Sequence, residues 1–140
     1  MKILLPVDGS PHSDRATQHV IAMLQGCGGH QVLLINVQAP IDAPEIRSHM
    51  PAGEIEAMQE TRGGDALVSA RALLDKAGIA NTPTVLIGPI AETIAQFAAD
   101  QGCDQIVMGT RGLGTLGGML LGSIATELLR LTQLPVTLVK

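Results

Sequence analysis

The sequence predicts an α/β fold: one doubly wound, five-stranded parallel sheet with helices on both faces. Two features of the chain lead to this prediction. Five short apolar runs are nearly continuous rather than alternating, which is typical of parallel strands buried on both faces. Helical patterns separate these runs, so strands and helices alternate along the chain. With 140 residues, the chain is expected to form a single domain over residues 1–140.

The first elements follow directly from the sequence. The apolar run Lys2–Val7 predicts a strand, and Asp8-Gly9 predicts the turn after it. Ser10-Pro11 is expected to start a helix, with serine as the cap and proline at the first helical position. Apolar residues at helical spacing continue this helix until the glycines at positions 26, 28 and 29 end it. The run Gln31–Val37 predicts the second strand.

The middle of the chain is expected to hold a loop and a long helix. Residues Gln38–Gly53 contain three prolines and scattered charge, and we interpret them as a long loop that covers a site, contacts a partner or is simply mobile. Apolar residues on one side predict a helix from about Glu54 to Ala77. The pair Gly63-Gly64 lies in its middle, where it is expected to kink the helix.

The last third repeats the alternation of strand and helix. Three further β-prone apolar runs predict strands at Thr82–Ile87, Gln105–Met108 and Pro135–Val139. Between them, the apolar spacing predicts helices at Ala91–Ala99 and Gly122–Leu131.

Composition excludes several classes of function. Hydrophobic residues make up 46% of the chain and charged residues 16%, as in a globular protein. The net charge of −4 argues against binding to nucleic acid or to a membrane surface. Phe97 is the only aromatic residue, so any bound base would lie between aliphatic side chains. Cys27 and Cys103 form no C-x-x-C pair, and we interpret both as packing residues in a reducing compartment, with a structural disulfide as the alternative. The first apolar run is interrupted at Asp8. We therefore expect a cytoplasmic protein with no signal peptide and no transmembrane segment.

The stretch Met108–Ser123 contains two overlapping glycine patterns. The first, Gly112-x-Gly114-x2-Gly117, has the spacing of a dinucleotide-binding turn. That motif requires an acidic residue about 20 positions later, and the final strand has none there. A Walker A loop is also excluded, because the chain has no Gly-Lys-Ser/Thr sequence.

The second pattern, Gly109-x2-Gly112-x9-Gly122-Ser123, is better suited to holding an anion. Six of its first fourteen residues are glycine, which allows the backbone to approach a ligand closely. The loop leads into the start of a helix, where free N–H groups and the helix dipole favour phosphate. Its only charged residue is Arg111. The alternative is a flexible loop with no ligand.

The position of Asp8 depends on the order of the strands. In the order 3-2-1-4-5, strand order reverses between strands one and four, so Asp8 faces the glycine loop across the crevice where ligands bind. The carboxylate then suits a ribose hydroxyl, or a magnesium ion that bridges to phosphates. In the order 2-1-3-4-5, Asp8 would face Gly88 and the glycine loop would have no role. A turn-forming aspartate is the simpler interpretation of Asp8 alone.

Taken together, these segments resemble the universal stress protein family over the whole chain. They are Val7-Asp8-Gly9-Ser10, Ile106-Val107-Met108-Gly109, the long glycine pattern and the closing Pro135-Val136. The resemblance implies the 3-2-1-4-5 sheet, a cytoplasmic homodimer and the branch of the family that binds ATP. It also implies a nucleotide-binding regulatory protein of the stress response, with an unidentified protein partner.

The resemblance assigns roles to individual positions. Asp8 is expected to meet the ribose or a metal ion, and the Val37 backbone to read the adenine edge. Gly109, Gly112, Gly122 and Ser123 are expected to hold the phosphates. The remaining nucleotide-binding positions are Pro6, Val7, Met108, Arg111 and Ile124.

This chain departs from the family pattern at two places. Gly117-Gly118 stand where the family often has a basic residue, and Ile124-Ala125 stand where a second hydroxyl often follows the glycine-serine pair. Thr126 is a candidate substitute for that hydroxyl. Because both departures affect phosphate contacts, AMP or ADP would suffer less from them than ATP.

No set of residues indicates a dedicated catalytic site. His12, four residues after Asp8, is interpreted as a surface residue at a helix start. The alternatives to a regulatory protein are a slow magnesium-dependent ATP hydrolase and a dimeric interaction module that binds no nucleotide. The short C-terminal strand would leave an open sheet edge, and pairing of two copies along this edge would form the homodimer. The alternative is an edge that is protected by Lys140 and by its short length.

Overall fold

The computed structural model describes residues 1–41, 43–111 and 121–140. Within them, five strands form one parallel sheet in the order β3-β2-β1-β4-β5, which confirms the predicted fold class and strand order. The strands are β1 (Lys2–Pro6), β2 (Gln31–Gln38), β3 (Asn81–Ile87), β4 (Gln105–Gly109) and β5 (Val136–Val139). The helices are α1 (Pro11–Leu24), α2 (Pro44–His49), α3 (Ala52–Lys76), α4 (Ile90–Asp100) and α5 (Ser123–Leu131).

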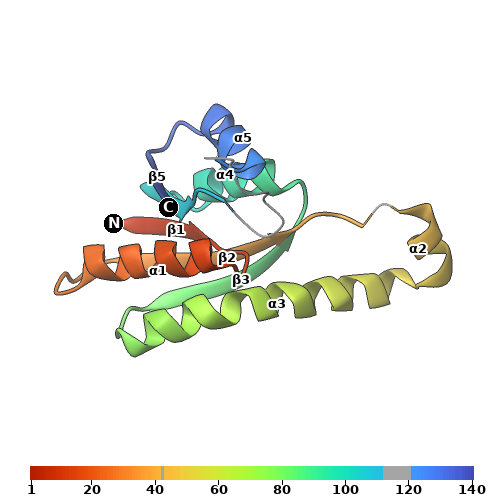
Figure 1. Cartoon of the computed structure of the whole chain (residues 1–140), viewed down its shortest axis with the longest axis horizontal. Helices are drawn as coiled ribbons and strands as arrows, with labels where there is room; N and C mark the ends of the chain where they lie inside the picture. The colour runs from red at the N-terminus through yellow and green to blue at the C-terminus, as the bar shows by residue number, and fades with distance from the viewer. Residues whose placement is uncertain (42, 112–120) are drawn as a thin grey trace.

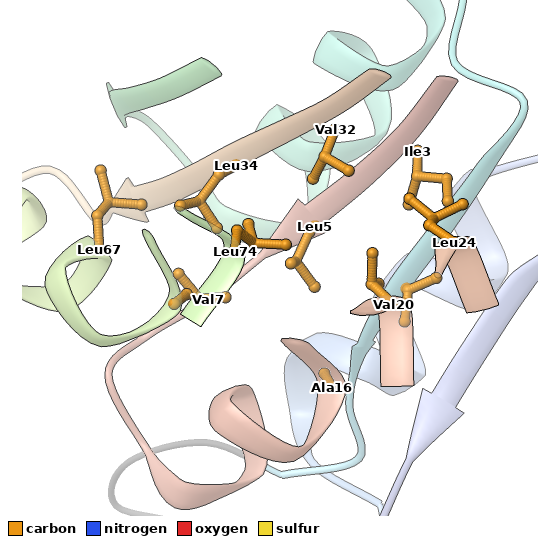
Figure 2. Packing of buried hydrophobic residues seen from close by; sticks show 12 residues of the cluster. Ile3, Leu5, Val7, Ala16, Val20, Leu24, Val32, Leu34, Leu67 and Leu74 are labelled. Carbon is orange, nitrogen blue, oxygen red and sulfur yellow. The ribbon is translucent and has the colours of Figure 1, made fainter. Parts of the chain in front are cut away.

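Helices cover both faces of the sheet, α1 and α3 on one face and α4 and α5 on the other (Figure 1). Alternate residues of β1 therefore enter different cores. Ile3 and Leu5 pack with α1 and α3, as Figure 2 shows, whereas Leu4 packs with α4 and α5. All three side chains are fully buried. This two-sided burial explains why the strand sequences are continuously apolar.

The segment between β2 and α3 is not the long loop that its prolines suggested. α2 lies within it, and α3 begins two residues earlier than expected, at Ala52. Pro44 occupies the first turn of α2, and Pro51 is the N-cap of α3. Proline is tolerated at these positions because the first amides of a helix have no intrahelical partner. α2 and the first turns of α3 extend beyond the end of the sheet (Figure 1).

α3 continues without a break through Gly63 and Gly64, where a kink was expected. The reason for Gly63 is close packing rather than bending. It is buried against β2 and β3, and an added Cβ would overlap the methyl groups of Val85 and lie 3.2 Å from Oδ1 of Asn36. At Gly64, nothing lies within 4 Å of an added Cβ. The first glycine therefore sets the distance between α3 and the sheet, and the second does not.

The two glycines predict opposite effects of alanine on stability. Gly63→Ala is expected to lower the free energy of unfolding by about 1–3 kcal/mol, because the stiff Val85 side chain has to move. Gly64→Ala is expected to raise it by about 0.5–1 kcal/mol, since alanine favours the helix. Urea unfolding followed by circular dichroism measures both. Equal stabilisation by the two substitutions would contradict the close contact at Gly63.

The two edges of the sheet differ. In β3, the Gly88 N–H donates to the Gln38 carbonyl of β2, so the backbone alternation directs the nitrogen of Pro83 outward, away from β2. Along β5, the carbonyls of Pro135 and Val139 accept hydrogen bonds from the N–H groups of Ile106 and Thr110, at 3.0 and 2.9 Å. The N–H groups of Val136 and Leu138 consequently face outward. The outer edge of β5 thus presents backbone donors, whereas proline removes a donor from the edge of β3.

Candidate functional site

A cavity of about 340 Å³ opens at the carboxyl ends of β1, β2 and β4. The chain proceeds from β1 to β2 and β3 on one side and returns to β4 on the other, so strand order reverses between β1 and β4. Ligands of doubly wound proteins bind at such a crevice. Ten residues predicted for the site line this cavity: Pro6, Val7, Asp8, Val37, Met108, Gly109, Arg111, Gly122, Ser123 and Ile124. Gly112 lies outside the described residues.

Asp8 is held in place by the start of α1. The chain turns at Gly9, which has a positive φ of 82°, and Ser10 then caps the helix. Oδ1 of Asp8 accepts hydrogen bonds from the Ser10 N–H at 2.9 Å and from Oγ of Ser13 at 2.8 Å. The Asp8 N–H donates to the same Ser13 hydroxyl at 2.9 Å. These contacts fix the orientation of a half-buried carboxylate at the wall of the cavity.

The N-terminus of α5 forms the opposite part of the wall. Gly122 is its N-cap, and as a glycine it has no side chain that could cap the first turn. The Gly122 N–H donates to the Thr110 carbonyl at 2.6 Å, which anchors this end of the glycine segment to the end of β4. The first N–H groups of α5 and the positive end of its dipole are arranged as an anion site requires. The Thr126 hydroxyl donates to the Gly122 carbonyl at 3.0 Å, and Thr126 does not line the cavity.

β4 and α1 approach each other closely at Gly109. An added Cβ there would lie 2.8 Å from Cβ of His12 and 3.1 Å from its carbonyl oxygen, so only glycine fits. His12 is half-buried in the first turn of α1, and it does not line the cavity. Its Nε2 is buried and has no hydrogen-bond partner among the described residues. Desolvation, followed by the charges of Arg15 and Arg111, lowers the pKa of His12, while Asp8 opposes the shift.

Several residues of the cavity wall were not predicted from the sequence. They are Ser13, Asn36, Gln38, Ala39, Ile90, Ile94, Thr110 and Ala125. The two isoleucines come from α4 and supply an aliphatic wall, as expected for a chain without stacking aromatics. Ser13 was recognisable, because it lies one helical turn after the Ser10 cap and therefore on the same side of α1. The one signal for Asn36 is that it is the single polar residue in the apolar run Val32–Val37.

Two further properties of the described residues concern metal sites and membrane spans. In the part of the chain that the structure describes, no cluster of three or more His, Cys, Asp or Glu side chains could bind a metal ion by itself. Among the same residues, no helix is long and apolar enough to cross a membrane.

Comparison with known proteins identifies the family. The model of the universal stress protein family matches residues 1–140. The chain belongs to the universal stress protein family. A family member from Thermus aquaticus, the universal stress protein in the QAH/OAS sulfhydrylase 3' region, is 33% identical over 139 residues. The match covers 99% of this chain and 97% of that protein.

Solved structures of family members share the fold. The structure of MJ0577, a universal stress protein of Methanocaldococcus jannaschii, superposes with a TM-score of 0.84 at 27% identity and covers 99% of this chain and 94% of that one. A universal stress protein in complex with cAMP superposes with a TM-score of 0.73 at 20% identity, covering 100% and 97% of the two chains.

Proposed function

We propose that this universal stress protein binds an adenine nucleotide in the cavity between β1 and β4, and that nucleotide occupancy regulates its interaction with a protein partner. The observation that carries the proposal is the shared location of a carboxylate and a helix N-terminus whose first N–H groups have no hydrogen-bond partner among the described residues. Asp8 and the first turn of α5 line one cavity at the switch point of the sheet. A nucleoside phosphate needs both, since its ribose presents hydroxyls and its phosphates are anionic.

The rest of the cavity suits the base and the remaining phosphates. Ile90 and Ile94 provide apolar contact for a purine, and the Val37 backbone would hydrogen-bond its edge. Gly109, Gly122 and Ser123 would hold the phosphates, together with Gly112. The fold of a relative that was solved in complex with cAMP supports an adenine ligand. ATP, ADP and AMP are all candidates.

A magnesium ion, if present, would arrive with the nucleotide. Mg²⁺ commonly uses one or two carboxylates together with phosphate oxygens and water. The Asp8 carboxylate fits that role as a single protein ligand, whereas the described residues offer no cluster for an ion without a nucleotide. When bound, the ion would neutralise phosphate charge next to Asp8.

The absence of tryptophan and tyrosine gives a direct test of the function. The protein absorbs almost nothing in the near ultraviolet, so an adenine nucleotide that co-purifies with it would dominate the spectrum. We expect a stoichiometric adenine signal, or saturable binding of ATP with magnesium by calorimetry. A blank spectrum together with no binding of ATP, ADP or AMP would refute the proposal and favour the nucleotide-free interaction module. Phosphate release above background would instead identify the slow hydrolase.

Regulation through the segment after β2 is part of the proposal. Gln38 and Ala39 line the cavity, and the chain continues from them to α2. Nε2 of the buried Gln59 in α3 donates to the Ala39 carbonyl at 2.8 Å. A ligand that contacts this wall would therefore act on both α2 and α3. The exposed surface of α2 is the part of this segment that a protein partner could reach.

We further propose a homodimer through the outer edge of β5. Leu138→Pro is expected to yield a monomer, because it removes an outward N–H without breaking a hydrogen bond to β4. Leu138→Ala is the matched control: it loses the side chain but keeps the N–H, so it should remain a dimer. Light scattering at matched concentrations measures the masses. A dimeric Leu138→Pro protein would place the interface elsewhere.

The proposed compartment is the cytoplasm. Both cysteines are unpaired, with Cys27 exposed and Cys103 buried, as is usual in a reducing compartment. Burial raises the pKa of the Cys103 thiol, which suits a packing role.

A further inference from the structure

The hydrogen-bond ladder between β1 and β2 ends in an unusual way. The Val7 N–H donates to the Ile35 carbonyl at 2.9 Å, and the next bond of a regular parallel ladder would join the Val37 N–H to the Val7 carbonyl. The described residues do not form that bond. The Val7 carbonyl accepts instead from Nδ2 of Asn36, at 2.8 Å. The Asn36 side chain thus occupies the Val7 carbonyl, to which the Val37 N–H would donate in a regular ladder.

The orientation of the Asn36 carboxamide follows from its partners. Its Oδ1 accepts a hydrogen bond from Nε2 of Gln38 at 2.6 Å, and its NH₂ group is the only end that can donate to a carbonyl. Asn36 is only 3% exposed. Gly63 allows α3 to pack directly over this side chain, because an added Cβ would lie 3.2 Å from its Oδ1. The carboxamide is therefore held on both sides.

The Val37 backbone faces the cavity as a result. The Gln38 carbonyl accepts from the Gly88 N–H, so it faces β3, and the alternation of the strand turns the N–H and C=O of Val37 toward β1. β1 has already ended there, and Val37 lines the cavity. A backbone N–H that is shielded from water and unpaired costs free energy, so a ligand that supplies a hydrogen-bond acceptor there binds more tightly.

We propose that Asn36 is a positioning residue for base recognition: by occupying the Val7 carbonyl, it keeps the Val37 N–H for the edge of a purine. This inference rests on the proposed nucleotide function. Adjacent N–H and C=O groups complement adenine, which presents a ring-nitrogen acceptor beside an amino donor. Guanine presents a ring N–H donor beside a carbonyl acceptor on the same edge, which is the opposite pattern. Asn36 thereby favours adenine without touching the base.

The test replaces Asn36 and compares ligands with and without a base. In Asn36→Leu, the Val7 carbonyl is released and can accept from the Val37 N–H. We expect the affinity for ATP to fall about tenfold, the loss of one hydrogen bond, and the preference for ATP over GTP to fall with it. Affinity for tripolyphosphate, which has no base, is expected to stay unchanged. In the nucleotide-free protein, hydrogen exchange of the Val37 amide should become slower than in the wild type.

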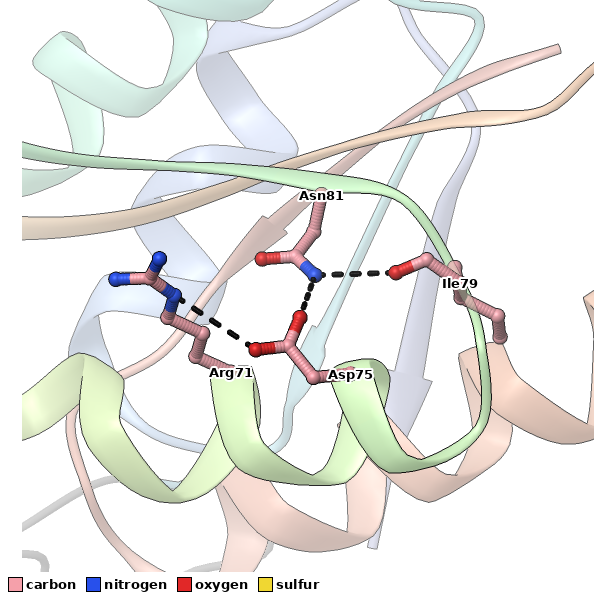
Figure 3. A network of polar contacts seen from close by, with 4 residues as sticks. All are labelled: Arg71, Asp75, Ile79 and Asn81. Carbon is pink, nitrogen blue, oxygen red and sulfur yellow. Dashed lines mark hydrogen bonds and ion pairs between the residues drawn. The ribbon is translucent and has the colours of Figure 1, made fainter.

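Asn81→Leu provides a matched control. Nδ2 of Asn81 also donates to a backbone carbonyl, that of Ile79 at 3.1 Å, as well as to Asp75, which Arg71 pairs with in turn (Figure 3). This asparagine lies at the start of β3, the end of the sheet away from the cavity. The same substitution there should leave both nucleotide affinities and the exchange of the Val37 amide unchanged.

A second variant guards against misfolding of Asn36→Leu. Asn36→Ala removes the donor to the Val7 carbonyl without adding bulk next to Gly63 and without burying a charge, so the same changes are expected. An unchanged preference for ATP over GTP in a folded Asn36 variant, or an unchanged exchange rate of the Val37 amide, overturns the inference alone. A wild-type protein that binds no nucleotide overturns the proposed function, and the inference with it.

Discussion

Replacing Gly122 by valine is expected to reduce the affinity for ATP by about a hundredfold or more while the protein stays folded. Gly122 lines the cavity next to the first N–H groups of α5, so a valine side chain there would obstruct a phosphate that approaches these groups. Loss of two hydrogen bonds to a charged phosphate, at about 1.5–3 kcal/mol each, is sufficient for this effect. Gly122 has φ −72° and ψ 160°, an extended conformation that valine adopts readily. Calorimetry of ATP binding and a thermal melt test both parts of the prediction.

Gly28→Val is the matched control for this substitution. Nothing lies within 4 Å of a Cβ added at Gly28, and the residue is exposed between α1 and β2, away from the cavity. The control should bind ATP as the wild type does. An undiminished affinity in Gly122→Val would show that α5 does not hold the phosphates.

Asp8→Asn is expected to lower the affinity for ATP with magnesium by about tenfold to a hundredfold. Asparagine keeps an oxygen for the Ser10 N–H and the Ser13 hydroxyl, so the turn before α1 can persist. The negative charge is lost, and with it the stronger hydrogen bonds or the metal contact that a carboxylate provides. Binding is measured with ATP, with and without magnesium, and with adenosine.

The three ligands separate the two roles considered for Asp8. If the carboxylate binds magnesium, the substitution removes the dependence on the ion and leaves adenosine unaffected. If it binds the ribose, affinity falls equally for all three. Asp14→Asn is the charge-matched control, since Asp14 lies further along α1 and outside the cavity. Equal affinities in the wild type and Asp8→Asn would exclude both roles.

The sequence predicted the architecture because burial on two faces is visible in the chain itself. From Ile3 to Val7 every residue of the first run is apolar, as is typical of a parallel strand covered on both faces. Predictions from single residues were wrong for residue types that occur in more than one structural context. Prolines at the starts of α2 and α3 resembled loop residues, and Gly63 resembled a hinge although it serves close packing. The choice between these uses depends on tertiary neighbours, which the sequence does not display.

The site residues that could be predicted from the sequence are those placed by the order of the strands and by the turns that follow them. Asp8 follows β1, Gly109 ends β4 and Gly122 caps α5, so their shared position could be inferred from the strand order. Asn36 could not be found in this way. It lies inside an apolar strand, and its importance depends on one hydrogen bond to a carbonyl 29 residues away in the chain. Roles that arise from a single long-range contact leave no periodic or local signature.

If two copies pair through β5, as proposed above, Pro83 limits how many copies of the protein can join. A protein that can pair through both edges of its sheet can form a filament, since each added copy exposes another unpaired edge. Here the outward nitrogen of Pro83 blocks β3 at its middle, whereas β5 keeps its outward donors. Because only the β5 edge can pair, each copy would bind one partner and no filament would form. Because Pro83 prevents pairing at the β3 edge, self-association through the sheet is expected to stop at two copies at any concentration.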